Sequence, residues 1–170
     1  YKKASLSVHL NVVGLDYHIG SQITDVLPFM EALDKALELI DKLKAENINL
    51  SHIDIGGGIG VEYNNEKTID IEKYIQSVVK KVGDLHVIIE PGRSIVGNAG
   101  IFVTKVEHLK QNDSKSFAII DGAMNDLIRP ALYGSYHNVV KVSDNQDGIN
   151  ASWDIVGPVC ETADFLAKDR

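Results

Sequence analysis

The first half of the chain alternates short apolar runs with longer segments in which apolar and charged residues are interleaved. The short runs, at residues 12–19, 50–55 and 85–89, are rich in aliphatic and β-branched side chains, which is typical of strands. Between them, apolar residues recur every three or four positions over residues 26–43 and 71–82, as on one face of a helix. Strand, helix, strand, helix, strand with short connections predicts an α/β fold built on a parallel sheet.

The third of these strands ends at charged residues. Its run at residues 85–89 is almost entirely apolar, which predicts burial on both faces of the sheet. Glu90 follows at once. Pro91 and Gly92 then end the strand and let the backbone come close to a ligand, and Arg93 supplies a fixed positive charge. We interpret this acid and base at a strand end as a candidate site, although a surface turn with a local ion pair has the same pattern.

The other two strands also end in residues that could bind a ligand or take part in a reaction. His18 and Ser21 follow the first strand, and three consecutive glycines, Gly56, Gly57 and Gly58, follow the second. Adjacent glycine N–H groups can surround an anion, and the positive end of the next helix adds to the attraction, so a phosphate is the expected ligand. A tight turn and a structural histidine are the simpler interpretations. In barrels of alternating strands and helices, the chemistry takes place at the carboxyl ends of the strands.

Beyond Gly97 the helical periodicity disappears. Runs at residues 101–106, 117–120 and 153–156 predict further strands. A long loop at residues 121–137 separates the last two, and long ordered loops often carry function. The second half is therefore expected to be mainly β.

Charge and composition exclude several classes of function. Asp and Glu number 24 against 17 Lys and Arg, and the net charge of −7 argues against a nucleic-acid or anionic membrane surface. No apolar run approaches the ~20 residues of a membrane-spanning helix, and no basic leader precedes an apolar segment. The single cysteine, Cys160, rules out an internal disulfide and fits a reducing compartment. We expect a cytoplasmic protein that acts on a small molecule, with no metal site.

Five segments together resemble the fold-type III decarboxylases that depend on pyridoxal phosphate. The segments are His18-Ile19-Gly20-Ser21-Gln22, Asp54-Ile55-Gly56-Gly57-Gly58, Glu90-Pro91-Gly92-Arg93, Asp121-Gly122-Ala123-Met124-Asn125-Asp126-Leu127-Ile128-Arg129-Pro130-Ala131-Leu132-Tyr133 and Gly157-Pro158-Val159-Cys160-Glu161. The likeness extends over nearly the whole chain. The last two segments are similar to the diaminopimelate-specific branch of the family and separate it from the branches that act on ornithine and arginine.

The resemblance implies that the chain binds pyridoxal 5′-phosphate. Glu90 would lie against the pyridine nitrogen and keep it protonated, so that the ring accepts the electrons left when carbon dioxide departs. His18 would stack on the ring face. The phosphate end would be held by the other cofactor-binding residues, which are Ser21, Gly56, Gly57, Gly58, Pro91, Gly92 and Arg93.

The resemblance also assigns residues to the substrate. Arg93, Arg129 and Tyr133 would grip the carboxylate at its far end, where a planar bidentate donor is suitable. Glu161 would bind the distal ammonium group. Cys160 would return a proton to the carbon that has lost carbon dioxide, and in the family this cysteine comes from the neighbouring subunit of a homodimer.

The implied reaction is the conversion of meso-2,6-diaminopimelate to L-lysine and carbon dioxide, the last step of lysine biosynthesis. The alternative is an ornithine-, lysine- or arginine-type decarboxylase of the same fold. A substrate with a bare amine at its far end, however, has no use for a clamp made of Arg129 and Tyr133. A non-catalytic homologue that binds a partner or sequesters the cofactor is a further alternative, motivated by the absence of the family's Schiff-base lysine.

That lysine lies near the end of an early barrel strand in the family, and nothing before Val12 fits such a position. We therefore expect residues 1–96 to be the second half of a TIM-type (β/α)8 barrel. Residues 97–170 would be the start of a mainly β domain that carries the substrate-binding and proton-donor residues. As a fragment, the chain would be active only when the missing parts are supplied.

Overall fold

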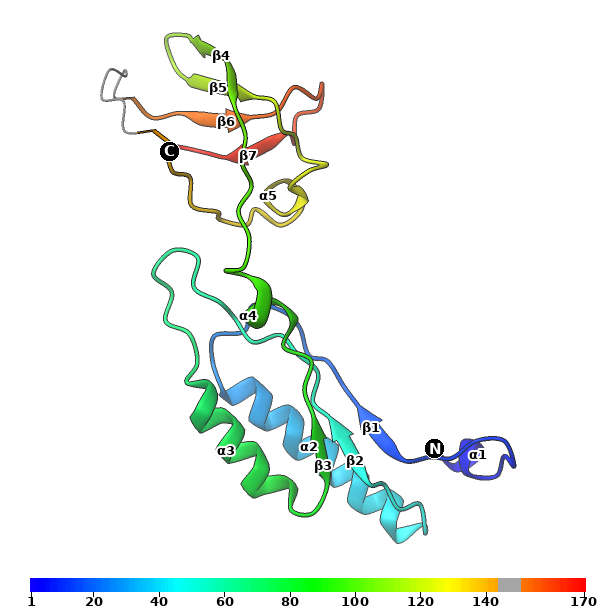
Figure 1. Ribbon diagram of the computed structural model, residues 1–170. Coiled ribbons are helices and arrows are strands. Elements are labelled where there is room, and N and C mark those ends of the chain that lie inside the picture. The colour runs from blue at the N-terminus through cyan, green and yellow to red at the C-terminus, as the bar shows by residue number, and fades with distance from the viewer. Residues whose placement is uncertain (144–150) are drawn as a thin grey trace. The chain divides into compact units, whose positions relative to one another are not determined.

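The computed structural model describes residues 1–143 and 151–170. They fold into two compact units, each built on its own sheet (Figure 1). In the first unit, helices accompany a parallel sheet, which confirms the predicted α/β fold. Unit 1 comprises residues 1–62 and 66–100, and unit 2 comprises residues 63–65 and 101–170.

Unit 1 is organised around a three-stranded parallel sheet in the order β1-β2-β3. The strands pair in register, so that their central residues Leu15, Ile53 and Val87 lie side by side. This is the parallel sheet that the alternation predicted, although each regular strand is shorter than its apolar run. The strands are β1 (Gly14–Asp16), β2 (His52–Asp54) and β3 (His86–Ile88).

Two helices, α2 (Leu27–Ala45) and α3 (Ile71–Val82), pack their apolar stripes on one face of this sheet. The Phe29 and Tyr74 rings meet in the resulting core with their centres 5.0 Å apart. Burial raises the pKa of the Tyr74 hydroxyl to about 12, so this ring stays neutral. Burying one large apolar side chain stabilises a fold by about 1.5–3 kcal/mol. The buried core residues are Leu15, Phe29, Leu33, Ala36, Ile40, Ile53, Ile55, Ile59, Ile69, Tyr74, Val78 and Val82.

The opposite face of the sheet is open within unit 1. On β3, His86 and Ile88 are exposed, and only Val87, which packs against the core, is partly buried. The prediction that this strand is buried on both faces is therefore wrong for the described chain. The reason is the two-residue alternation of a strand, because α2 and α3 cover only the face that carries Leu15, Ile53 and Val87.

Local signals explain where α3 begins and ends. Asp70 precedes it and accepts a hydrogen bond from the Lys73 N–H at 3.1 Å. Gly83 follows it with a φ of 64°, a conformation that glycine adopts without strain. Two short helices, α1 (Lys2–Ser5) and α4 (Gly92–Val96), complete unit 1. No helix in the described ranges is long and apolar enough to cross a membrane.

Unit 2 is organised around a four-stranded sheet in the order β4-β5-β6-β7. β5 pairs antiparallel with β4 and parallel with β6, and β7 pairs antiparallel with β6. A short helix, α5 (Ile128–Tyr133), lies in the long connection between β5 and β6. The strands are β4 (Val106–Gln111), β5 (Ser116–Ile120), β6 (Asp154–Val156) and β7 (Phe165–Ala167).

Two sequence expectations for unit 2 need correction. The strand expected at residues 101–106 lies further along the chain, because regular pairing begins only at Val106 and Ile101 is 89% exposed. An apolar run alone did not distinguish an exposed connection from a paired strand. β7 was not among the strands that the sequence predicted. Pairing with β6 and burial of Leu166 and Ala167 hold it in place.

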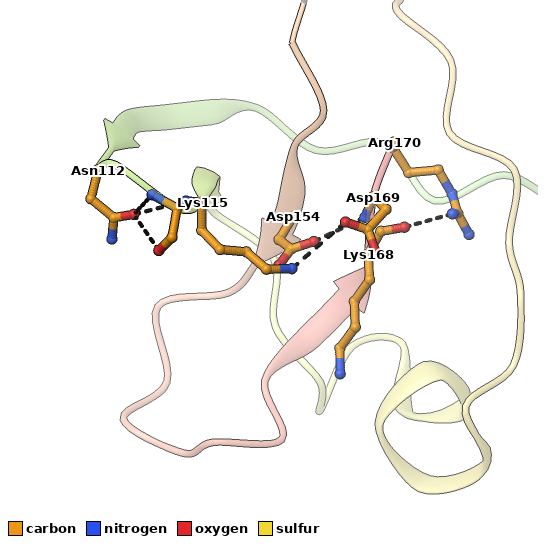
Figure 2. A network of polar contacts seen from close by, with 7 residues as sticks. Asn112, Lys115, Asp154, Lys168, Asp169 and Arg170 are labelled. Atoms are coloured by element: carbon orange, nitrogen blue, oxygen red, sulfur yellow. Dashed lines mark hydrogen bonds and ion pairs between the residues drawn. The ribbon is translucent and has the colours of Figure 1, made fainter.

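A buried carboxylate links two segments of unit 2 through a network of polar contacts (Figure 2). Asp154 of β6 is 3% exposed, and its oxygens accept hydrogen bonds from Lys115 Nζ and from the Asp169 N–H, both at 2.9 Å. Burial acts to raise the pKa of Asp154, but the hydrogen bonds from Lys115 and Asp169 outweigh it and hold the pKa below its ordinary value. The network joins the turn between β4 and β5 to the segment that follows β7.

We expect Asp154→Asn to lower the free energy of unfolding at neutral pH by about 1–3 kcal/mol, the range for disrupting a buried hydrogen-bonded group. A carboxylate whose pKa is lowered by folding contributes stability above its ordinary pKa of 3.8 and loses that contribution as pH falls through the folded value. The difference between wild type and variant should therefore shrink in acid. Urea unfolding followed through Trp153, the chain's only tryptophan, measures both quantities. A difference that stays constant from neutral pH to acid would contradict this account.

Candidate active site

The carboxyl ends of the three strands of unit 1 lie next to one another. Hydrogen bonds continue the parallel pairing beyond the strands themselves. The Tyr17 N–H donates to the Asp54 carbonyl at 3.1 Å, and the Glu90 N–H donates to the Gly56 carbonyl at 2.8 Å. His18, Gly56 and Glu90, which are far apart in the sequence, are thereby brought to one edge of the sheet.

Glycine is required at two positions because other backbone segments pass close by. A Cβ on Gly57 would overlap the Glu90 carbonyl oxygen, and one on Gly58 would overlap the Gly20 carbonyl oxygen. Gly58 also has a φ of 89°, a region that favours glycine. The glycine segment therefore lets the loops after β1, β2 and β3 touch through their backbones.

Two of the three glycine N–H groups are already bonded within unit 1. The Gly56 N–H donates to Asp54 Oδ1 at 2.9 Å, and the Gly57 N–H donates to His18 Nδ1 at 3.3 Å. In addition, α3 begins only at Ile71, so its N-terminus does not directly follow the glycines. The expectation that three free N–H groups and the next helix form an anion site is therefore wrong in that form. The bond from Gly57 instead orients His18, whose Nδ1 acts as an acceptor, so that Nε2 carries the ring proton.

Gln22 is a site residue that sequence reasoning did not single out. Its Oε1 accepts hydrogen bonds from the Val61 N–H at 3.2 Å and from Arg93 Nη1 at 3.0 Å. Its Nε2 donates to the Val61 carbonyl at 2.6 Å. Gln22 thus links the loop after β1, the loop after β2 and Arg93. In the sequence, the signal for it was its place at the end of the first resembling segment.

Three carboxylates gather on the open face at the same edge. Oxygens of Asp16, Asp54 and Glu90 all lie within 4.8 Å of one another. Asp16 and Asp54 are register partners on β1 and β2, so both project away from the core. Within the described ranges, none of the three forms a salt bridge. The cluster is therefore a negative spot suited to a cationic group of a ligand.

In unit 2, Arg129 and Tyr133 lie one helical turn apart on α5. The guanidinium carbon of Arg129 is 5.0 Å from the centre of the Tyr133 ring, and Nη2 donates to Ser135 Oγ at 3.3 Å. Among the residues that the structure describes, no carboxylate forms a salt bridge with Arg129, and its buried Nε has no hydrogen-bond partner. A half-buried guanidinium held in this way is suited to binding an anion.

Cys160 and Glu161 lie in the turn between β6 and β7. Both side chains are exposed, so Cys160 is not the small buried hydrophobe that an isolated cysteine often is. Glu161 Oε1 accepts hydrogen bonds from the N–H and the hydroxyl of Thr162, both at 2.9 Å.

The site residues predicted from the sequence form two sets, one in each unit. Unit 1 holds His18, Ser21, Gly56, Gly57, Gly58, Glu90, Pro91, Gly92 and Arg93, and unit 2 holds Arg129, Tyr133, Cys160 and Glu161.

The part of the chain that carries these strand ends matches a known protein family. Residues 1–97 match the pyridoxal-binding domain of the pyridoxal-dependent decarboxylases, and the chain belongs to that family. The match confirms the resemblance and the cofactor class that the sequence predicted.

Within the family, the chain is similar to individual diaminopimelate decarboxylases. The diaminopimelate decarboxylase of Vibrio cholerae is 50% identical over 173 residues, which span 100% of this chain and 41% of the Vibrio protein. The crystal structure of the Helicobacter pylori diaminopimelate decarboxylase, complexed with L-lysine, superposes with a TM-score of 0.90 at 40% identity and covers 99% of this chain and 42% of the other.

A more distant likeness shows the fold alone. The lysine/ornithine decarboxylase of Vibrio vulnificus, complexed with cadaverine, superposes with a TM-score of 0.81 at 22% identity, over 95% of this chain and 44% of the other. In each case, the chain spans about two fifths of the length of the protein that it matches.

We expect Gly57→Ala to destabilise unit 1, because the added Cβ fits only if the backbone at Glu90 moves. Overpacking of this kind costs about 1–3 kcal/mol. Gly92→Ala is the matched control, since a Cβ at Gly92 would meet nothing within 4 Å. Urea unfolding followed by far-ultraviolet circular dichroism compares the two variants with wild type. Equal unfolding midpoints for the two variants would show that the close approach at Gly57 does not matter for stability.

Proposed function

We propose that the chain is part of a pyridoxal-phosphate-dependent enzyme that converts meso-2,6-diaminopimelate to L-lysine and carbon dioxide. In this assignment, residues 1–96 are the second half of a (β/α)8 barrel, and residues 97–170 are the start of a mainly β domain. The observation that carries the proposal is the convergence of His18, the glycine loop and Glu90 at one edge of unit 1. Because the chain spans about two fifths of its relatives, the activity belongs to the natural polypeptide that contains it.

The edge of unit 1 offers suitable groups for the pyridine end of the cofactor. Pyridoxal phosphate, when bound, supplies an electron sink for the charge left on the substrate as carbon dioxide departs. Glu90 would hold a proton on the pyridine nitrogen, because a positive charge there relieves the repulsion among Glu90, Asp16 and Asp54. His18, whose ring is oriented by the Gly57 N–H, would lie against the face of the pyridine ring.

The phosphate end would be held by the loops around the glycines. Arg93 supplies the positive charge, and its hydrogen bond to Gln22 orients the guanidinium toward these loops. The exposed hydroxyl of Ser21 is a further donor beside Gly20, which contacts the glycine segment. Since the Gly56 and Gly57 N–H groups are engaged, the arginine and serine side chains carry most of this binding, and the glycines shape the loop together with the turn at Pro91 and Gly92.

Unit 2 would supply the groups that recognise the substrate and complete the reaction. Arg129 and Tyr133 would bind the distal carboxylate, and the absence of a carboxylate partner for Arg129 in the described chain supports this role. Glu161 would bind the distal ammonium group. The exposed thiol of Cys160 would deliver a proton to the carbon that has lost carbon dioxide.

Two observations favour diaminopimelate over ornithine or lysine as the substrate. The relatives at 40–50% identity are diaminopimelate decarboxylases, whereas the lysine/ornithine decarboxylase shares 22%. Arg129 also suits a substrate with an anion at its far end, which ornithine and lysine lack. A non-catalytic homologue has no evident need for Arg129, Cys160 and Glu161 together.

The natural polypeptide that contains this chain should release carbon dioxide from meso-diaminopimelate much faster than from L-ornithine or L-lysine. Arg129→Met should raise KM for meso-diaminopimelate by roughly 10- to 100-fold, because a hydrogen bond to a charged group contributes about 1.5–3 kcal/mol. Arg170→Met, in the same unit, is the control, since Arg170 bonds to the Lys168 carbonyl and lies over Tyr136. A preference for ornithine would overturn the substrate assignment. A folded polypeptide that binds pyridoxal phosphate and releases no carbon dioxide from any of the three would favour the non-catalytic alternative.

We further propose a homodimer in which Cys160 completes the site of the neighbouring subunit. Cys160→Ala should lose about 100-fold or more, as for a missing proton donor. Glu90→Ala should also be nearly inactive, because Glu90 would keep the pyridine nitrogen protonated. When the two variants are mixed and allowed to exchange subunits, one site per mixed dimer combines an intact Glu90 with an intact Cys160. Activity should therefore recover in part. No recovery, with mixed dimers shown by native mass spectrometry, would place both residues in the site of a single subunit.

A further inference from the structure

We infer that Asp164 is a positioning residue, which holds the turn of Cys160 and Glu161 together with the segment that leads to Arg129. The inference rests on the proposed function and adds to it a residue that contacts neither cofactor nor substrate. The observations that carry it are the burial of Asp164 and the hydrogen bonds that it makes to two separate segments of unit 2.

Asp164 is 3% exposed, and four hydrogen bonds surround it. Its Oδ1 accepts from the Met124 N–H at 2.6 Å, and its Oδ2 accepts from the Val159 N–H at 2.8 Å. Its own N–H donates to the Glu161 carbonyl at 3.1 Å, and its carbonyl accepts from the Gly157 N–H at 3.1 Å. One residue is therefore bonded to the chain on both sides of the proposed proton donor.

The bonds to Val159 and Glu161 fix the turn that carries the thiol. Val159 immediately precedes Cys160, and Glu161 immediately follows it. A further bond from the Glu161 N–H to the Val159 carbonyl, at 2.8 Å, closes the turn. The exposed side chains of Cys160 and Glu161 thus stand on a short loop whose two ends are tied to Asp164.

The bond to Met124 ties the same carboxylate to the start of the α5 segment. Directly after Met124 the chain makes a turn, in which the Asp126 and Leu127 N–H groups donate to the Ala123 carbonyl at 2.9 and 3.2 Å. Asp126 Oδ2 accepts from the Ala123 N–H at 2.9 Å and stabilises the same turn. α5, with Arg129 and Tyr133, follows at once.

The backbone around Asp164 is shaped to bring these segments close together. A Cβ on Gly157 would overlap Asp164 Oδ2 and would lie 2.8 Å from the Ala123 Cα. A glycine at position 157 is therefore what allows the β6 end, the Ala123 turn and the carboxylate to share this space.

A comparison with Asp154 separates positioning from simple stabilisation. Both aspartates are 3% exposed and both lie in unit 2. Asp154 has Lys115 as a salt-bridge partner, and its hydrogen bonds go to Lys115 and Asp169, neither of which belongs to the turn of Cys160 or to the segment that leads to Arg129. Within the described ranges, Asp164 forms no salt bridge, and its two oxygens are used for backbone N–H groups of the substrate-binding segments. A carboxylate offers two separate acceptor oxygens, so each of the two backbone N–H groups has an oxygen of its own.

The test replaces each buried aspartate by asparagine in the natural polypeptide that contains this chain. In Asp164→Asn, one carboxylate oxygen becomes an NH2 group that faces a backbone N–H, so either the Met124 or the Val159 contact is lost. Misplacement of reacting groups by about 1 Å can cost roughly 100-fold in rate, so kcat for meso-diaminopimelate should fall by about 10- to 100-fold, with a higher KM. Asp154→Asn should destabilise the protein and leave both constants within about twofold. In Gly157→Ala, the added Cβ would displace the Asp164 carboxylate without changing it chemically. This variant should therefore show the same changes in kcat and KM as Asp164→Asn.

Stability and cofactor binding are measured on the same variants, well below their unfolding temperatures. Titration with pyridoxal phosphate should give wild-type binding for all three, because the proposed cofactor residues lie in unit 1. If Asp164→Asn and Asp154→Asn lose the same stability and keep the same kcat and KM, the positioning role is overturned. It is also overturned if Asp164→Asn and Gly157→Ala both fail to fold while Asp154→Asn folds, since Asp164 would then act on stability alone. A wild-type protein with no activity on meso-diaminopimelate would instead refute the proposed function.

Discussion

In-register pairing of three parallel strands is the constraint on which the candidate site of unit 1 depends. It places Asp16 beside Asp54 and lets the chain beyond each strand turn into a loop at the same edge. The loops then approach more closely than side chains would permit, because Gly57 lies against the Glu90 carbonyl and Gly58 against that of Gly20. These backbone contacts, together with the side-chain bond from Arg93 to Gln22, hold the loops of the site to one another.

Carboxylates that accept backbone N–H groups recur at several loops of the chain. Asp54 accepts from Gly56 in the glycine loop, and Asp164 accepts from Val159 beside Cys160. Asp121, at the end of β5, accepts from the Lys105 N–H and the Thr104 hydroxyl, and these bonds hold the pKa of Asp121 below its ordinary value. Such bonds are charge-assisted and local, so they can fix a loop without the long apolar stretches that a core requires.

Periodicity predicted the elements that pack against a core, and little else. The stripes of α2 and α3 and the three parallel strands followed from spacing, because burial on one face imposes a regular repeat. The sequence carried no such signal for β7, for the bonds of Gln22 or for the burial of Asp164, since each depends on pairing with another segment and not on a local repeat. The sequence predicted an anion site at the glycine segment, but the Gly56 and Gly57 N–H groups are hydrogen-bonded within unit 1. The close backbone contacts of Gly57 and Gly58 were not predicted.

The open face of the unit 1 sheet shows how binding and core packing are divided between the two sides of one strand. On β1 and β2, Leu15 and Ile53 face the helices and are 6% and 0% exposed, while Asp16 and Asp54 project from the other side. At its carboxyl edge this face carries carboxylates instead of apolar side chains, so it presents a negative surface beside a backbone that the parallel pairing holds in place. Because the helix-covered face alone holds the apolar core of unit 1 within the described chain, the carboxylates of the open face take the place of no core side chain.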